Sequence, residues 1–469
     1  MRKIIFKESI NEGSAMYEDL IFPRGFVFGA ATAALQIEGD REGRGETIWD
    51  DFCAKRGNVL DGSNTDIACD HVHRYKEDVA IMKQMGLDAY RFSISWARIF
   101  PDESGIPNEA GVEFYNNLID ELIKYGIEPY ITLFHWELPM YIQRLGGWSN
   151  PAIADKFGKF AEFVGKTYGD RVKKYITFNE PQSFLGYGYR RGTHPPLLKM
   201  TDKEYLYAIH NFFRAHGMAV RALRATVPNA EIGITMSTTA NYPASDSPED
   251  IEAAKMSNLD IVNDDSFVMN IIHWCDPIYF GKYPDKAYEV FGDDMPYMSE
   301  EDSKLISEPL DFHGQNCYSA SMIKSDGKGG YQVAKRPLGS PKNSLNWAVT
   351  PEAIGFVSKI LYERYKKPIY ITENGICCND WVCEDGKVHD SYRVDFYHKY
   401  LKNLNEAIKD GADVRGYFAW SLLDNFEWAK GYTARFGLVY VDYETQRRIP
   451  KDSAEFYADV IKFNKNYNK

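Results

Sequence analysis

Short runs of β-branched and aromatic residues alternate along the whole chain with longer segments whose apolar residues recur at helical spacing. The strand-like runs cover residues 26–34, 89–96, 128–136, 174–180, 231–237, 311–318, 368–373 and 414–422. The helix-like segments cover residues 74–87, 113–125, 152–168, 203–226, 351–366 and 392–410. Because strands that alternate with helices pair in parallel, the pattern predicts an α/β fold, a (β/α)₈ TIM barrel, with its active site at the carboxyl ends of the strands.

The chain has 469 residues and contains no linker rich in Pro, Gly or Ser that would divide it. Barrels of this class often remain one domain at such lengths. We therefore expect a polar N-terminal tail over residues 1–19 and a single barrel domain over residues 20–469. Three long polar insertions, 240–265, 324–345 and 376–390, follow the fifth, sixth and seventh strands. We expect them to form walls of a pocket, with plain surface loops as the alternative.

Two glutamates stand at the ends of strand-like runs, with most of the chain between them. Glu180 ends the run that begins at Tyr175, and Glu373 ends the run that begins at Pro368. A carboxylate at the tip of an apolar strand is costly unless something uses it. Two carboxylates that meet across a barrel mouth are the groups needed to break a glycosidic bond.

Polar or aromatic residues stand at nearly every other strand end as well. These are Gln36, Arg91, His135, Trp136, Asn179, Asn316, Cys317, Tyr318, Trp420, Glu427 and Trp428. Such side chains are poor choices for burial without partners, so their repetition at one end of the strands indicates a polar site.

With these residues in view, the chain resembles glycoside hydrolase family 1, the retaining β-glycosidases, from about Phe22 to Phe463. The segments Thr177-Phe178-Asn179-Glu180-Pro181 and Ile371-Thr372-Glu373-Asn374-Gly375 stand where the two signatures of that family stand. The resemblance implies that Glu373 is the nucleophile and Glu180 the acid/base, about 5–5.5 Å apart. We expect Arg91 to lower the pKa of Glu373, and the charge of Glu373 to raise the pKa of Glu180.

The same resemblance implies roles for further residues. Asn179 is expected to bind the sugar 2-hydroxyl, and Tyr318 to donate a hydrogen bond to the nucleophile, with a plain core tyrosine as the alternative. The expected sugar-binding set is Gln36, His135, Trp347, Trp420, Glu427 and Trp428. Trp347 is expected to be a platform on the aglycone side, with a structural role as the alternative.

Glu427 bears on the choice of substrate. Relatives that cleave phosphorylated disaccharides carry serine, lysine and tyrosine in this loop, whereas this chain reads Asn425-Phe426-Glu427-Trp428-Ala429-Lys430-Gly431-Tyr432. A glutamate would repel a phosphate, so we expect an unphosphorylated β-glycoside. Departures from the common family pattern at Phe134, Glu137, Gln315, Cys317 and 191–196 leave the aglycone preference open.

Composition limits which binding partners and which cellular compartment we expect for this protein. The net charge of −12 disfavours nucleic acid and anionic membranes. Seven cysteines without regular spacing fit a reducing cytosol better than a disulfide framework. No run approaches 18 consecutive apolar residues, and the N-terminal residues do not read as a signal peptide. We therefore expect a cytoplasmic protein with a small glycoside as its substrate, and leave homo-oligomerisation open.

Three other motifs do not indicate a second catalytic or binding site. The segment Cys69-Asp70-His71-Val72-His73 lacks zinc-ligand spacing. Cys377 and Cys378 are adjacent and would form a bridge only with strain. Gly327-Lys328-Gly329-Gly330 lacks the spacing of a phosphate-binding loop. No metal or organic cofactor is implied.

The sequence thus predicts a retaining β-glucosidase that removes terminal, non-reducing β-D-glucosyl residues. Cellobiose and aryl β-glucosides are the expected substrates, with β-galactosides and β-fucosides as further ones, and carbohydrate breakdown such as cellulose degradation is the expected context. The alternatives are a 6-phospho-β-glucosidase and a non-catalytic glycan-binding barrel. Hydrolysis and sugar transfer share one intermediate, so the sequence does not separate them.

Overall fold

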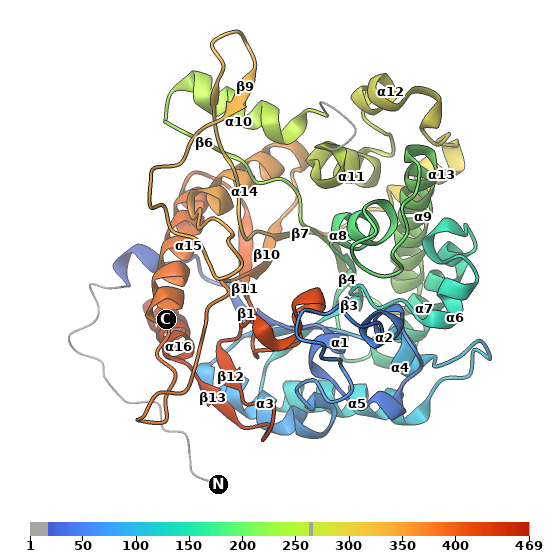
Figure 1. Cartoon of the computed structure of the whole chain (residues 1–469), viewed down its shortest axis with the longest axis vertical. Coiled ribbons are helices and arrows are strands. Elements are labelled where there is room, and N and C mark those ends of the chain that lie inside the picture. Colours follow the sequence, from blue (N-terminus) through green and yellow to red (C-terminus); the bar gives the residue numbers. More distant parts are fainter. Residues whose placement is uncertain (1–16, 262–265, 469) are drawn as a thin grey trace.

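The computed structural model describes residues 17–261 and 266–468. At its centre lies a closed barrel in which eight strands pair in parallel (Figure 1). In barrel order these are β1 (Val27–Ala31), β2 (Ala89–Ser93), β3 (Glu128–Phe134), β4 (Lys174–Asn179), β5 (Glu231–Met236), β7 (Phe312–Asn316), β10 (Ile369–Asn374) and β11 (Val414–Trp420). All eight predicted strands and the predicted (β/α)₈ barrel are confirmed.

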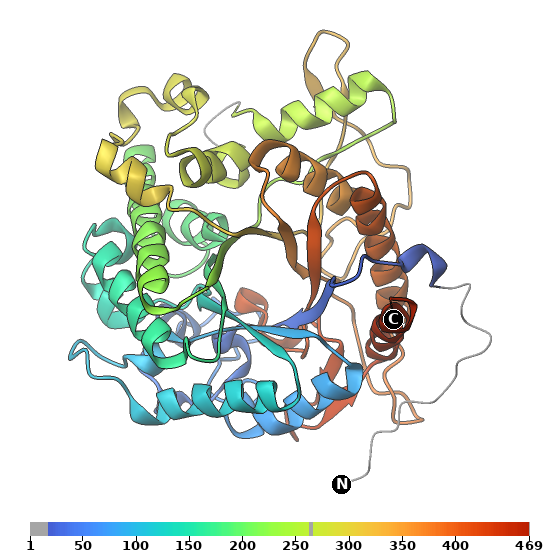
Figure 2. The same ribbon diagram turned by 180° about the vertical axis from the view of Figure 1, so that it is seen from behind.

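Helices surround the barrel, as the view from behind also shows (Figure 2). The long ones are α3 (His71–Met85), α5 (Glu109–Lys124), α7 (Ile153–Tyr168), α9 (Asp202–Thr226), α14 (Glu352–Tyr365), α15 (Ser391–Lys409) and α16 (Asp452–Tyr467). The shorter ones are α1 (Ala34–Ile37), α2 (Ile48–Ala54), α4 (Trp96–Ile99), α6 (Met140–Arg144), α8 (Pro181–Leu185), α10 (Pro248–Leu259), α11 (Ile271–Phe280), α12 (Asp285–Phe291) and α13 (Glu300–Ile306). The six predicted helical segments correspond to α3, α5, α7, α9, α14 and α15.

Local sequence signals explain where the helices begin and which face they bury. In α9, Thr201 and Glu204 form a reciprocal capping box at the first turn, which satisfies backbone N–H groups that have no partner inside the helix. In α7, Phe157, Phe160 and Val164 recur at helical spacing and are fully or almost fully buried against the barrel.

The barrel interior is filled by large side chains. Tyr130, Phe312, Tyr370 and Phe418 belong to one buried cluster inside the ring of strands. Gly233 on β5 is required by this packing, because a Cβ atom there would lie 2.3 Å from the Phe312 ring. The packed interior closes the barrel below its carboxyl end, so any site must lie above it, among the loops that follow the strands.

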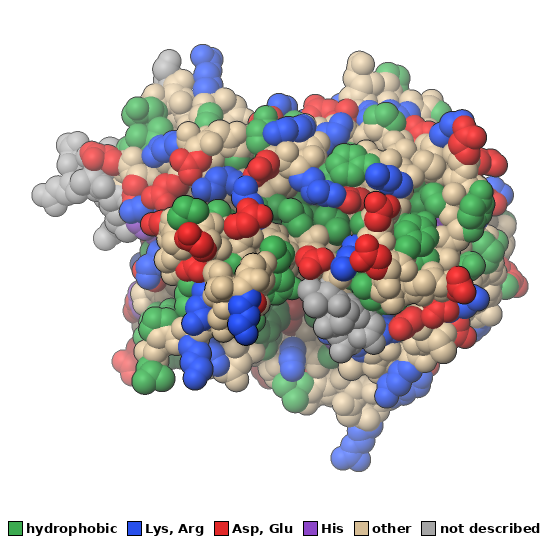
Figure 3. Space-filling model, turned by 90° about the horizontal axis from the view of Figure 1, so that it is seen from above, with side chains coloured by type: hydrophobic (Ala, Val, Ile, Leu, Met, Phe, Trp, Pro, Cys, Tyr) green, Lys and Arg blue, Asp and Glu red, His purple; other side chains and the backbone are tan. Residues whose placement is uncertain are grey.

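The first two polar insertions contain regular structure. β6 (Tyr242–Pro243), β8 (Met322–Ser325) and β9 (Tyr331–Val333) form a small sheet that joins them. The helices α10 to α13 lie between β5 and β7 in sequence, and acidic and basic side chains are mixed on this side of the molecule (Figure 3). A second small sheet pairs β12 (Val439–Val441) with β13 (Arg448–Pro450) near the C-terminus.

The N-terminal part of the described chain packs on the C-terminal helices. Tyr17 lies against the rings of Phe456 and Phe463 at 6.0 and 5.7 Å, and Asp19 pairs with His398 and Lys402. Residues 17–19 of the expected tail therefore belong to the fold, whereas residues 1–16 lie outside the described residues. Among the helices of the described chain, none has the length and apolar character needed to cross a bilayer.

Candidate active site

Arg91 and Tyr318 hold the two oxygens of Glu373, which lies on β10 close to its carboxyl end. Arg91 Nη1 donates to Glu373 Oε1 at 2.8 Å, and the Tyr318 hydroxyl donates to Glu373 Oε2 at 2.7 Å. The other guanidinium nitrogen of Arg91 donates to Asn179 Oδ1 at 2.6 Å. Arg91 thus links the end of β4 to Glu373, and both carboxylate oxygens have a fixed direction.

Glu180 is the first residue after β4, and its backbone turns there. Its φ of 47° lies in the left-handed region, and Pro181 starts α8 directly afterwards. Asn316 Nδ2 donates to Glu180 Oε1 at 2.8 Å, and the Ser183 hydroxyl donates to Glu180 Oε2 at 2.8 Å. Because Asn316 also donates to Asn179, the two strand ends are tied together.

Burial governs the protonation of both carboxyl groups. It raises the pKa of Glu373 to about 7; Arg91 and Tyr318 lower that pKa, and the neighbouring charge of Glu180 raises it. Burial also raises the pKa of Glu180, against the hydrogen bonds from Asn316 and Ser183. Arg91 lowers the pKa of Glu373, as expected, but desolvation outweighs this ion pair and the net shift of the pKa is upward. For Glu180 likewise, burial rather than the charge of Glu373 is the main cause.

The expected sugar-binding side chains are brought to the same place. Gln36 Nε2 donates to the carbonyl of Phe426 at 2.8 Å, which joins the loop after β1 to the loop after β11. Asn179 Nδ2 donates to His135 Nε2 at 3.0 Å. The His135 ring stacks on Trp420 and on Trp428, with centroids 5.7 and 6.0 Å apart.

Several buried polar atoms of this group have no hydrogen-bond partner within the described chain. They include Gln36 Oε1, His135 Nδ1 and Glu427 Oε2. Burial and Arg91 lower the pKa of His135 well below its ordinary value, so its ring is neutral. Since buried polar groups are normally paired, three such atoms from three loops indicate a place where a ligand rich in hydroxyl groups binds.

Glu427 is the third carboxyl group of the site. Burial, followed by the charges of Glu373 and Glu180, raises its pKa to about 8. The three carboxyl groups therefore interact electrostatically, and a proton is retained in the site near neutral pH.

Above these residues lies a cavity of about 840 Å³. Site residues that line it are His135, Asn179, Glu180, Tyr318, Trp347, Glu373, Trp420, Glu427 and Trp428. Gln36 and Arg91 are not among the residues that line the cavity, although both bind residues or loops that do. Trp347 is 39% exposed and contacts Tyr318 and Phe436 at ring distances of 5.9 and 6.0 Å, so it forms the outer wall.

The first two insertions contribute to the cavity wall, but the third does not. Ala240, Asn241, Val333, Arg336 and Leu345 line the cavity, whereas no residue of 376–390 does so. The expectation for the third insertion was wrong, because two of its acidic residues, Asp380 and Asp390, pair with Arg393 behind the cavity wall.

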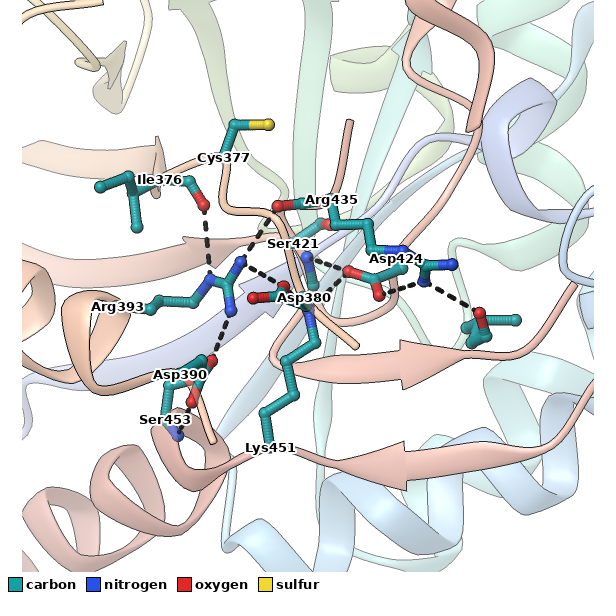
Figure 4. Close-up of polar contacts among 12 residues, drawn as sticks. Ile376, Cys377, Asp380, Asp390, Arg393, Ser421, Asp424, Arg435, Lys451 and Ser453 are labelled. Carbon is teal, nitrogen blue, oxygen red and sulfur yellow. Dashed lines mark hydrogen bonds and ion pairs between the residues drawn. The ribbon is translucent and has the colours of Figure 1, made fainter. Parts of the chain in front are cut away.

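Figure 4 shows that arrangement. Asp380 accepts from Arg393 at 2.7 Å and from Lys451 at 2.5 Å, and Asp390 pairs with Arg393. Lys451 also donates to Asp424, which pairs with Arg435.

Sequence reasoning left out three residues that contact the site. Asn316 and Trp136 are recognisable from the sequence only as residues at strand ends, without a role in the site. Ser183 carries no sequence signal, because it follows Glu180 by one turn of a short helix. Trp136 has a φ of 74° and donates from its indole nitrogen to the carbonyl of Asn179 at 3.1 Å.

The histidine-rich segment after the first strand has a structural role. His71 Nδ1 and Asp78 Oδ2 are 2.7 Å apart, and Asp78 also pairs with Arg448. Within residues 17–261 and 266–468, no three His, Cys, Asp or Glu side chains are grouped in a way that suits a metal ion.

Comparison with known proteins gives concordant matches over nearly the whole chain. A family model described as Glycosyl hydrolase family 1 matches residues 18–466. A 1,4-beta-D-glucan glucohydrolase of Thermotoga neapolitana is 43% identical over 446 residues, covering 94% of this chain and 98% of the relative. Beta-glucosidase A of Thermotoga maritima is 42% identical with the same coverage. The solved structure of a Thermotoga maritima beta-glucosidase in complex with glucoimidazole matches with a TM-score of 0.86 and 42% identity, covering 95% of this chain and 99% of that one.

Proposed function

Since this chain belongs to glycosyl hydrolase family 1, as its sequence resemblance indicated, we propose that it is a retaining β-glucosidase acting on terminal, non-reducing β-D-glucosyl residues. The relatives that match over almost their full length are named as enzymes that act on β-glucosides or β-glucans. The observation that carries the proposal is the joint fixation of Glu373 by Arg91 and Tyr318, opposite a Glu180 held by Asn316 and Ser183.

In the first half-reaction, Glu373 attacks the anomeric carbon while Glu180 gives its proton to the leaving oxygen. The roles follow from the donors around each group. Glu373 has a guanidinium at 2.8 Å, which favours its ionised form, whereas Glu180 has only neutral donors. Burial raises the pKa of both groups, and we assign the shared proton to Glu180 from the donors alone, because only Glu373 has a cation at hydrogen-bond distance.

In the second half-reaction, Glu180 takes a proton from water while the water oxygen attacks the anomeric carbon of the glycosyl ester. The bond to Glu373 breaks, and Glu373 is released as a carboxylate. The ester carries no charge, so the repulsion between the two carboxylates disappears and the pKa of Glu180 falls. The same pair can then supply an acid first and a base afterwards.

The glycone is held by Gln36, His135, Asn179 and Glu427, and Trp420 and Trp428 form the apolar surface beside it. The unpartnered atoms of Gln36, His135 and Glu427 supply acceptors and donors for sugar hydroxyls. Asn179, fixed by Arg91, is placed to bind the 2-hydroxyl, a contact that strengthens in the transition state.

The substrate is an unphosphorylated β-glucoside, such as cellobiose or an aryl glucoside, because an ionised Glu427 repels a 6-phosphate and a protonated Glu427 offers it no positive charge. We retain β-galactosides and β-fucosides as further substrates, cellulose breakdown as the context, and a cytoplasmic location. Homo-oligomerisation is left open.

The test is hydrolysis of para-nitrophenyl β-D-glucopyranoside beside its 6-phosphate and its β-galactoside analogue, with wild type and Glu373→Ala. We expect turnover of the plain glucoside and its loss in the variant. Turnover of the 6-phosphate alone would favour a 6-phospho-β-glucosidase. Sugar binding by the wild type without turnover would favour a glycan-binding barrel.

A further inference from the structure

The insertion 324–345 is basic in a chain whose net charge is −12. It contains Lys324, Lys328, Lys335, Arg336 and Lys342, and its only carboxylate is Asp326. None of the five cations forms an ion pair with any carboxylate in the described part of the chain, where most other arginines do. This insertion follows β7 and supplies part of the cavity wall, so its charge lies beside the proposed substrate-binding site.

Arg336 brings one of these charges to the cavity itself. It is half-buried and lines the cavity, and its Nη2 donates to the carbonyl of Val349 at 2.8 Å. Val349 follows Ala348 and Trp347, which both line the same cavity. The guanidinium therefore lies on the Trp347 side. Arg336 donates two hydrogen bonds to backbone carbonyls, contacts the neutral Tyr242 and pairs with no described carboxylate, so its charge is not neutralised and N–H donors remain for a ligand.

A second cation reaches the cavity from a different loop. Lys430 lies in the 3₁₀ turn Trp428–Thr433, is exposed and lines the cavity. Its ammonium group forms no ion pair among residues 17–261 and 266–468. Two unpaired cations from separate loops thus border one opening.

The carboxyl groups that line the cavity lie apart from these two cations. Among residues 17–261 and 266–468, the carboxyl groups that line it are Glu180, Glu373 and Glu427, at the ends of the barrel strands and the loop after β11. Glu373 is paired with Arg91. Between this floor and the cations, the wall contains Met322, Val333, Ala334, Leu345 and Trp347, which are apolar. The sign of the charge therefore reverses from the floor to the outer half.

We propose that the outer half of the cavity binds a leaving group that carries a carboxylate, with Arg336 as the main anion-binding residue and Lys430 beside it. The inference rests on the proposed β-glucosidase function and specifies its substrate as a β-glucoside of an anionic aglycone. The apolar wall contacts the body of the aglycone, and Arg336 offers its carboxylate a charge-assisted hydrogen bond. The lysines of the insertion add a long-range attraction that salt screens.

The experiment compares kcat/KM for two matched pairs of substrates. The first pair is 4-carboxyphenyl β-D-glucopyranoside and its methyl ester, and the second is cellobionate and cellobiitol. The two substrates of a pair differ in intrinsic leaving-group ability. The readout is therefore the kcat/KM of the anionic substrate divided by that of the neutral one, and how this anion-to-neutral ratio changes with salt and with mutation. We expect the ratio to fall as NaCl is raised from about 20 to about 500 mM, since screening weakens the attraction.

We expect Arg336→Gln to lower the ratio by about three- to tenfold at low salt, the effect of removing one charge about 4 Å from a carboxylate in water. Arg336→Lys, which keeps the charge, should restore most of it. Lys328→Gln, at the exposed turn between β8 and β9 and away from the cavity lining, is the matched control and should change the ratio little.

A ratio that is the same in wild type and Arg336→Gln, or that does not fall with salt, would overturn the proposal. If Arg336→Gln lowers the anion-to-neutral ratio of the aryl pair alone, the leaving group is an aromatic acid. If it lowers the ratio of the cellobionate pair alone, the leaving group is a sugar acid. Hydrolysis of neither member of either pair would remove the proposed function and this inference together. Turnover of the neutral substrates without an effect of Arg336 would remove only the inference.

Discussion

Lys451 donates from its ammonium group to Asp424 Oδ1 at 2.7 Å, and neither side chain is exposed (Figure 4). The same ammonium group donates to Asp380, which lies in the loop after β10. Strand β10 carries Glu373. Asp424 in turn accepts from the backbone of Gly437, in the loop that carries Glu427. Lys451 and Asp424 therefore fasten the loop after β10 to the loop after β11 behind the cavity.

We expect Lys451→Met to destabilise the protein by about 3–5 kcal/mol, because removal of one partner leaves buried carboxylates without compensation. The measurement is the shift of the urea unfolding midpoint. Lys304→Met, which breaks the exposed pair with Glu300, is the matched control and should have little effect. Equal midpoints for both variants would contradict the role given to Lys451.

Tyr318→Phe should move the acid limb of kcat/KM to higher pH. The hydroxyl of Tyr318 donates to the Glu373 carboxylate and lowers its pKa, so its loss raises that pKa further above about 7. A nucleophile must be ionised, so activity is lost as the pH falls through this pKa. A hydrogen bond to a charged group contributes about 1.5–3 kcal/mol, which corresponds to a shift of about one to two pH units.

The measurement is the pH profile of kcat/KM on a neutral aryl glucoside. Tyr331→Phe, in β9 and away from Glu373, serves as the control. An acid limb that stays in place in Tyr318→Phe would show that the hydroxyl does not tune the nucleophile.

Glu180→Gln should impair poor leaving groups far more than good ones. Without the acid, kcat/KM for cellobiose is expected to fall by about 10²- to 10⁴-fold, whereas a dinitrophenyl glucoside needs little protonation and should lose much less. The comparison of the two substrates is the measurement.

Ser183→Ala is the matched control, because it removes only a donor to Glu180. Loss of that donor raises the pKa of Glu180, so the basic limb of the pH profile should move to higher pH while turnover is retained. Equal losses on both substrates in Glu180→Gln would contradict the acid/base assignment.

Measured above about pH 8, where Glu427 is ionised, Glu427→Gln should lower kcat/KM for para-nitrophenyl β-D-glucopyranoside by about 10- to 100-fold, because a charged hydrogen bond to a sugar hydroxyl becomes a neutral one. The variant keeps the size of the side chain and removes the charge that repels a 6-phosphate. The preference for the plain glucoside over its 6-phosphate should therefore narrow. An unchanged preference would show that Glu427 does not exclude the phosphate.

Patterns of short range made the barrel predictable. Each strand is a run of β-branched and aromatic residues, and a strand is recognised from its own residues without knowledge of its neighbours. The positions of Glu180 and Glu373 at strand ends could be read in the same way, because the parallel pairing of a barrel brings all carboxyl ends to one face. The eight strands agree with the structure to within a few residues at each end.

Contacts between side chains from distant segments could not be predicted from such local sequence patterns. Ser183 and Asn316 reach Glu180 from α8 and from the end of β7, and the acidic residues of 376–390 turn toward Arg393 and Lys451 instead of the cavity. Which partner a polar side chain finds depends on how loops far apart in sequence pack.

The sequence by itself determined the barrel, the family and the two carboxyl groups at the strand ends, because these follow from local periodicity and from short motifs. Only the tertiary structure decided the protonation of those groups. The pKa of Glu373 is raised to about 7 because the closed barrel and its loops remove water from a carboxylate, and this desolvation outweighs the attraction of Arg91. Burial is a property of the whole fold, and no single segment of the chain encodes it.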